Sequence, residues 1–174
     1  TIVETFVGCG GSHLGFKRHN FRTIFVNDIW NTALKTLKEN NKELDEKKII
    51  CEDINTLCNK DLLKEYNLKK KDLNLLIGGV VCKGFSLAGV RNPFDTRNYL
   101  YISQLKLVEQ FMPMISIIEN VPGMKNMKIL AKNAYAPCSK EKIKDFKIDE
   151  SIEELCEKVN IVIENHKNNR GQII

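Results

Sequence analysis

The first 28 residues, TIVETFVGCGGSHLGFKRHNFRTIFVND, contain the pattern that decides the fold. Residues 1–8 are rich in apolar and β-branched side chains, and residues 10–20 open as a helix after a run of glycines. Residues 22–28 form a second apolar run, which ends on an acid. A strand, a helix and another strand in this order predict one βαβ unit.

The same alternation continues along the chain. Three further strands are predicted from short apolar runs, the last two of them buried on both faces, over residues 47–54, 73–81 and 114–121. Helices are predicted over residues 29–41, 58–68 and 99–111. This order predicts an α/β fold, a doubly wound, mostly parallel sheet with helices on both faces. Ligands of such sheets bind at the carboxyl ends of the strands, so the residues just after each strand are expected to form the site.

The composition fits one globular domain. With 174 residues, 43% hydrophobic and 28% charged, the chain is long enough to bury a core. It has no apolar run of about 18 residues and no basic-then-apolar leader, so we expect no membrane span and no secretory signal. The protein is expected inside the cell, in the cytoplasm if it is bacterial and in the nucleus if it is eukaryotic.

The net charge and the cysteines restrict the classes of function that this chain can have. Six cysteines are scattered without the spacing of metal ligands, which predicts free thiols and no metal site. The 27 basic residues exceed the 22 acidic ones, and the resulting charge of +5 is compatible with an anionic partner such as nucleic acid.

Glycine-rich or polar segments follow the five predicted strands. They are FVGCGG (6–11), ND (27–28), EDI (52–54), GGVVCKGFS (78–86) and ENV (119–121). The first is a turn where missing side chains let a ligand approach backbone N–H groups, but His13 replaces the third glycine of the dinucleotide fingerprint. Asp28 is placed to accept hydrogen bonds from a ribose and Asp53 from an adenine amino group, although such acids are also common helix caps. These features predict a nucleoside-bearing ligand.

The five segments, in this order and spacing, resemble the motifs of the cytosine-5 methyltransferases. That family carries an FxGxGG turn, an acid after the second strand, a D-I pair, a GGPPCxGFS loop and an ENV strand end. The resemblance covers residues 1–130, where we expect a cofactor-binding and catalytic domain, with a helical extension of the same domain over residues 131–174. It implies S-adenosylmethionine as the cofactor. The cofactor-binding residues that it implies are Phe6, Gly8, Cys9, Gly10, Gly11, Asp28, Ile29, Asp53, Ile54 and Gly79.

The resemblance also implies a covalent mechanism on cytosine. Carbon 5 is a poor nucleophile, so a thiolate adds to carbon 6 and forms an enamine that attacks the sulfonium methyl group. Cys82 matches the nucleophile, Glu119 matches the acid that binds the target base, and Asn120 belongs to the same motif. Because neither edge of the base is accessible within a duplex, the base must be flipped out. The implied nucleic-acid contacts in and after the nucleophile loop are Ser86, Arg91 and Arg97.

Three positions beside the nucleophile depart from the family pattern. Val80 and Val81 replace two prolines, and Lys83 replaces a glutamine. Valine leaves the approach to the thiol less rigid than proline, whereas the lysine charge favours the thiolate. Three interpretations therefore stay open: a DNA cytosine-5 methyltransferase, a tRNA cytosine-5 methyltransferase of the same chemistry, and a catalytically silent cofactor-binding or regulatory module.

Residues 131–174 carry no resemblance to the family's target-recognition region. Over residues 151–163, a capping box and an apolar face at helical spacing predict a helix instead. We therefore expect target recognition to be carried by a second chain or by a segment that this sequence lacks.

Overall fold

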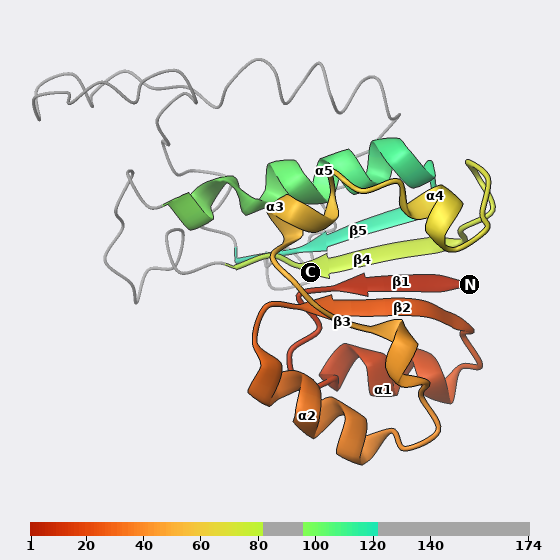
Figure 1. Ribbon diagram of the computed structural model, residues 1–174, viewed down its shortest axis with the longest axis vertical. Helices are drawn as coiled ribbons and strands as arrows, with labels where there is room; N and C mark the ends of the chain where they lie inside the picture. The colour runs from red at the N-terminus through yellow and green to blue at the C-terminus, as the bar shows by residue number, and fades with distance from the viewer. Residues whose placement is uncertain (82–95, 122–174) are drawn as a thin grey trace, which may run out of the picture. The chain divides into compact units, whose positions relative to one another are not determined.

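The computed structural model describes residues 1–81 and 96–121, and a five-stranded parallel sheet lies at its centre (Figure 1). The strand order is β3-β2-β1-β4-β5, so the order reverses between β1 and β4. This is the doubly wound sheet that the sequence predicts, and that prediction is confirmed. The strands are β1 (Ile2–Thr5), β2 (Thr23–Asp28), β3 (Ile49–Cys51), β4 (Leu75–Gly79) and β5 (Ile115–Glu119).

The chain divides into two compact units. The first comprises Thr1–Val80 and Leu100–Glu119 and contains the whole sheet. The second comprises Val81–Tyr99 and Asn120–Ile174, and its described part includes the short 3-10 helix η2 (Thr96–Tyr99). The domain boundary predicted at residue 130 lies outside the described residues.

Helices cover both faces of the sheet (Figure 1). One face carries α1 (Gly11–Arg18) and α2 (Asn31–Asn40), and the other carries α3 (Ile54–Leu57), α4 (Leu62–Glu65) and α5 (Leu100–Phe111). The 3-10 helix η1 (Glu46–Lys48) leads into β3. Within residues 58–68, where one helix is predicted, the chain forms only the single turn α4, which begins after its N-cap Asp61. The turn α3, capped by Asp53, ends before this range.

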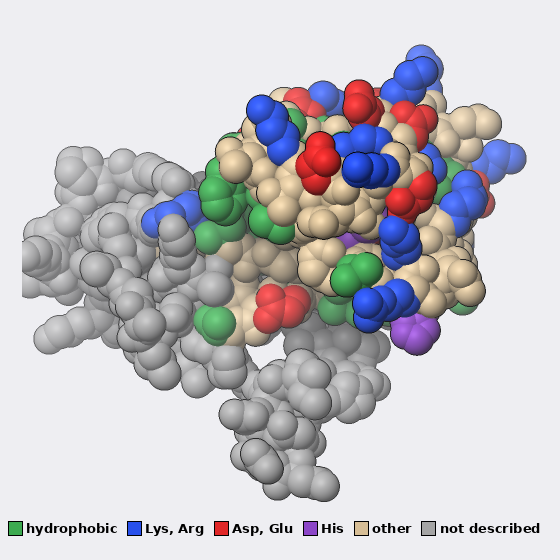
Figure 2. Space-filling model, turned by 90° about the horizontal axis from the view of Figure 1, so that it is seen from below, with side chains coloured by type: hydrophobic (Ala, Val, Ile, Leu, Met, Phe, Trp, Pro, Cys, Tyr) green, Lys and Arg blue, Asp and Glu red, His purple; other side chains and the backbone are tan. Residues whose placement is uncertain are grey.

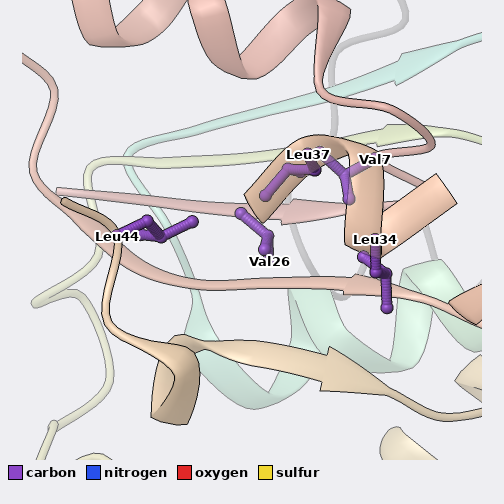
Figure 3. Close-up of a cluster of buried hydrophobic side chains, with 5 residues drawn as sticks. All are labelled: Val7, Val26, Leu34, Leu37 and Leu44. Carbon is purple, nitrogen blue, oxygen red and sulfur yellow. The ribbon is translucent and has the colours of Figure 1, made fainter. Parts of the chain in front are cut away.

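Apolar side chains fill the space between the sheet and each helical layer. Figure 3 shows the cluster beneath α2, which consists of Val7, Val26, Leu34, Leu37 and Leu44. On the opposite face, the ring of Phe25 lies 6.2 Å from that of Phe111 in α5 and 4.8 Å from that of Tyr66. Each such side chain stabilises the fold by about 1.5–3 kcal/mol relative to an exposed position. This packing holds the strands in place, and with them the segments that follow the strand ends.

Helix α5 packs closely against Gly78, at the place where β1 and β4 pair. Thr5 Oγ1 donates a hydrogen bond of 2.6 Å to Oε1 of Gln104, a fully buried residue of α5. A Cβ added to Gly78 would lie 2.6 Å from Thr5 Oγ1 and 2.7 Å from Cδ of Gln104. Both distances are shorter than real Cβ contacts, so only glycine fits at this position.

We expect Gly78→Ala to lower the free energy of unfolding by about 1–3 kcal/mol, the usual effect of overpacking a filled core. Gly15→Ala is the matched control, because an added Cβ at Gly15 in α1 has nothing within 4 Å. That substitution should stabilise the protein by about 0.5–1 kcal/mol through helix propensity. Urea unfolding measures both changes. If Gly78→Ala has the same free energy of unfolding as the unchanged protein, Gln104 moves aside without a cost in stability.

Strand β5 is less buried than the sequence predicts. Ile115 and Ile117 are 58% and 41% exposed, so the expectation of a strand buried on both faces is wrong for the described part of the chain. The register pairs Ile117 with Ile77 of β4, which in turn pairs with Glu4 of β1, so these residues share the sheet face that carries α1. The physical reason is connectivity: α1 and α2 link β1 to β2 and β2 to β3, and cover only that half of the face.

Candidate active site

Backbone hydrogen bonds join the carboxyl ends of β1, β2 and β3 into one edge. The N–H of Val7, in the turn after β1, donates to the carbonyl of Asn27 at 3.1 Å. The N–H of Glu52, after β3, donates to the carbonyl of Asp28 at 3.1 Å. The segments that the sequence predicts to form the site are therefore neighbours along this edge.

The ends of β4 and β5 meet the same turn on its other side. Gly79 ends β4, and a Cβ added there would lie 3.8 Å from Oε2 of Glu119 and 3.8 Å from the carbonyl oxygen of Phe6. The exposed carboxylate of Glu119 thus lies close to the ends of β1 and β4. The absence of a side chain at Gly79 keeps this space open.

The turn between β1 and α1 has a backbone that suits few residues. Phe6, Gly8 and Gly10 have φ angles of 53°, 55° and 91°, in the left-handed region. For Phe6 this conformation costs about 1–2 kcal/mol, and strain of this kind gathers at functional sites. An added Cβ at Gly8 or Gly11 would have nothing within 4 Å, so the space beside the turn is open to a ligand.

Asp28 ties this turn to the start of α2. Its Oδ2 accepts a hydrogen bond from the N–H of Gly8 at 2.8 Å, and its Oδ1 accepts one from the N–H of Trp30 at 2.9 Å. The N-cap of α2 is Trp30, so Asp28 is not itself the helix cap. Each carboxylate oxygen keeps a further lone pair, which leaves acceptors for ribose hydroxyls.

Asp53 is a helix cap in the structure. It is the N-cap of α3, and its Oδ1 accepts a hydrogen bond from the N–H of Asn55 at 2.8 Å. The next residue, Ile54, is 3% exposed, so its side chain belongs to the core and only its backbone can meet a ligand. The adenine contact of these two residues stays a prediction.

Two large apolar side chains are exposed beside Asp28. Ile29 and Trp30 are 67% and 63% exposed, although both follow a buried strand. Cys9, within the glycine turn, is also exposed and has a free thiol. Together they give the β1 to β2 edge an apolar surface against which a purine ring can pack.

Several predicted site residues cannot be placed in this geometry. Cys82, Ser86 and Arg91 lie outside the described residues, and their roles stay predictions. Arg97 is exposed in η2. Asn120 follows β5, and its Oδ1 accepts a hydrogen bond of 2.8 Å from the N–H of Val121.

Sequence reasoning missed a buried polar cluster next to the glycine turn. Glu4 in β1 is 1% exposed, and its carboxylate contacts His13 and Ser12 at the start of α1. The signal for it was an acid inside an apolar strand, because a buried carboxylate requires partners. Ser12 and His13 are the first polar side chains that follow the turn.

A cavity of about 200 Å³ lies at the amino ends of β2 and β3, where Thr23 and Lys48 line it. Its lysines are engaged within the chain: Lys48 Nζ donates to the carbonyl of Thr23 at 2.9 Å, and Lys17 pairs with Glu43. The hydrogen bond from Lys17 lowers the pKa of Glu43 below its ordinary value. This cavity is at the opposite ends of the strands from the candidate site.

Charges of both signs are mixed on the α2 side of the molecule. Figure 2 shows Lys and Arg interspersed with Asp and Glu on the described part of this face, without the basic stripe that follows a phosphate backbone. No helix among residues 1–81 and 96–121 is long and apolar enough to cross a membrane. In the same residues, no three or more His, Cys, Asp or Glu side chains are arranged to hold a metal ion.

Comparisons with known proteins agree on one family. A family model described as C-5 cytosine-specific DNA methylase matches residues 1–147. The Type II methyltransferase M.DdeI of Desulfomicrobium norvegicum is 37% identical over 129 residues, which cover 73% of this chain and 29% of the relative. M.AgeI of Thalassovita gelatinovora is 33% identical over 127 residues, 72% of this chain and 28% of the relative. This chain therefore spans less than a third of either relative's length.

A solved structure is similar in fold. It is described as a DNA modification methyltransferase encoded within an Escherichia coli prophage, and it matches with a TM-score of 0.58 and 24% identity. The match covers 91% of this chain and 37% of the other. At this identity the likeness shows the α/β fold alone.

Proposed function

This chain belongs to the C-5 cytosine-specific DNA methylase family, and on that premise we propose that it forms the catalytic part of a DNA cytosine-5 methyltransferase. In the proposed reaction, a methyl group passes from S-adenosylmethionine to carbon 5 of a cytosine flipped out of the duplex. The observation that carries the proposal is the meeting of the Phe6 backbone, Gly79 and the Glu119 carboxylate at one edge of the sheet.

We propose that S-adenosylmethionine binds along the edge from β1 to β3. The described residues fit such a ligand: the space beside Gly8 and Gly11 is open, and Asp28 keeps lone pairs for ribose hydroxyls. The exposed side chains of Ile29 and Trp30 offer an apolar surface to the adenine ring. When bound, this cofactor supplies an electrophilic methyl group on a sulfonium sulfur.

In the proposed mechanism, the chain's own residues prepare the cytosine. The thiolate of Cys82 adds to carbon 6, and the resulting enamine takes the methyl group at carbon 5. Glu119 holds ring nitrogen 3 and the exocyclic amine, and its proton stabilises the charge that develops on the ring during the addition. A base then removes the proton from carbon 5, the bond between carbon 6 and sulfur breaks, ring nitrogen 3 returns its proton to Glu119, and Cys82 is released as the thiolate.

Asp28→Ala should weaken the binding of S-adenosylmethionine by about 1–3 kcal/mol, the loss expected when ribose hydroxyls lose an ionised acceptor. Isothermal titration calorimetry on the intact protein measures the dissociation constant. Asp45→Ala is the matched control, because Asp45 also accepts a backbone hydrogen bond, of 2.9 Å from Lys47, but precedes η1 and β3 rather than following a strand. The control should bind as the unchanged protein does.

A deoxyribose analogue of the cofactor separates ribose binding from support of the turn, since Asp28 also holds Gly8. If Asp28 binds the ribose, the unchanged protein loses affinity for the analogue, whereas Asp28→Ala binds both ligands equally. If both proteins lose the same affinity for the analogue, Asp28 supports the turn alone and does not bind the ribose.

A second function has an observation in its favour. Val80 is 2% exposed, so a valine is packed firmly where the family pattern has a proline, and Lys83 replaces the glutamine after the nucleophile. These departures suit a catalytically silent module that binds the cofactor and regulates a partner. A methyl-transfer assay of the intact protein decides: methylated duplex DNA supports the enzyme, methylated tRNA the RNA-directed alternative, and cofactor binding without methylation of either supports the silent module.

The same proposal includes the substrate and the partners of the protein. DNA is the proposed substrate, which places the protein inside the cell with the genome. Because the chain spans 29% of M.DdeI and 28% of M.AgeI, we propose that target recognition is carried by a further segment or a second chain.

A further inference from the structure

A buried carboxylate connects β1 to the first turn of α1. Oε1 of Glu4 lies 2.6 Å from Nδ1 of His13, and Oε2 lies 3.1 Å from Oγ of Ser12. Glu4 is 1% exposed and His13 is 3% exposed. An ionised carboxylate only accepts hydrogen bonds, so with Glu4 ionised both Nδ1 of His13 and the hydroxyl of Ser12 donate to it.

This contact joins the two ends of the glycine turn. Glu4 stands two residues before Phe6, and Ser12 directly follows Gly11, so one side chain holds together the two ends of residues 6–11. Between those ends the turn is held at Gly8 by the carboxylate of Asp28. The left-handed backbone of the turn is thus maintained by side chains outside it.

Helix α1 has no side-chain cap of its own. Its N-cap is Gly10, which makes no side-chain hydrogen bond, and its first turn contains no acid. A negative charge near a helix N-terminus is favoured by the helix dipole. Glu4 supplies that charge from the neighbouring strand and binds two side chains of the first turn.

We propose that Glu4 is a positioning residue for S-adenosylmethionine. It acts through Ser12 and His13 to hold the backbone of Gly8, Gly10 and Gly11 in the arrangement that receives the cofactor, and it does not touch the cofactor itself. This inference rests on the proposed function of the turn. The benefit is preorganisation, because a turn already in its binding conformation loses less freedom when the ligand arrives.

The first measurement is the affinity of the intact protein for S-adenosylmethionine. Glu4→Ala should weaken binding about tenfold or more, as the loss of residues that orient binding groups does elsewhere. Ser103→Ala is the matched control, since it removes a partly buried hydrogen bond of 2.6 Å between two side chains, Ser103 and Asn55, in the opposite helical layer. The control should bind as the unchanged protein does.

A conservative variant distinguishes positioning from loss of packing. In Glu4→Gln the amide N–H can donate to Nδ1 of His13, provided that the ring proton moves to Nε2. We expect this variant to recover most of the affinity, and nitrogen-15 NMR of His13 to show the changed tautomer. Affinity as low as that of Glu4→Ala, despite a folded protein with the changed tautomer, would contradict positioning through these hydrogen bonds.

A third measurement does not depend on the cofactor. Amide hydrogen exchange at Gly8, Gly10 and Gly11 should accelerate in Glu4→Ala or, if that variant does not fold, in the milder Ser12→Ala, and should not change in Ser103→Ala. Unchanged exchange and unchanged affinity would overturn the inference. If the unchanged protein does not bind S-adenosylmethionine although exchange responds to Glu4, the proposed function fails while the support of the turn by Glu4 stands.

Discussion

Methyl transfer by the intact protein is expected to fall by roughly a thousandfold or more when Cys82 is replaced by serine, because loss of a catalytic nucleophile removes most of the chemical acceleration. A serine hydroxyl is a far weaker nucleophile than a thiolate at neutral pH. The affinity for S-adenosylmethionine should stay nearly unchanged, since the cofactor is expected along β1 to β3. Transfer of labelled methyl groups to duplex DNA measures the rate, and calorimetry measures the affinity.

The covalent intermediate provides a direct assignment of the nucleophile. DNA that contains 5-fluorocytosine, together with the cofactor, should form an adduct that survives denaturation, because the fluorine at carbon 5 cannot leave as a proton does. Mass spectrometry should place this adduct on Cys82. Cys58→Ser is the matched control, because Cys58 is buried in the first unit and its thiol contacts the carbonyl of Asn55, so this variant should still form the adduct. Methylation of carbon 5 without an adduct at Cys82 would refute the assignment.

Glu119→Gln should lower the rate of methyl transfer by about a hundred- to ten-thousandfold, the usual contribution of a positioned general acid. Glutamine keeps the shape of the side chain beside Gly79 and can still donate a hydrogen bond from its amide, but it cannot transfer a proton to ring nitrogen 3. Single-turnover kinetics on duplex DNA isolates the chemical step from product release.

The surface variant Glu109→Gln is the control for Glu119→Gln, because Glu109 is an exposed acid on α5. It should retain the rate of the unchanged protein. A Glu119→Gln variant that is as fast as this control would exclude the acid role, and a variant that instead loses cofactor affinity would move Glu119 into the cofactor pocket.

The sequence by itself determined the fold and the places where the site must lie. Apolar runs such as residues 73–81 and glycine-led helices such as residues 10–20 report local backbone preference, and local preference is encoded in neighbouring residues. Because carboxyl ends of parallel strands meet at one edge, the order of the segments already implied that Phe6 and Glu119 would lie at the same edge of the sheet. A Cβ added at Gly79 would lie 3.8 Å from an atom of each residue, which agrees with that expectation.

Only the tertiary structure decided which side chains meet and which are left uncovered. The contact of Glu4 with His13, the hydrogen bond of Asp28 to Gly8 and the exposure of Ile117 each depend on how strands and helices pack against one another. Such contacts join residues that are distant in sequence or lie in different elements, and a local sequence pattern does not reveal them. Asp53 shows the same limit, because a capping acid and a ligand-binding acid look identical in sequence until the helix that follows is placed.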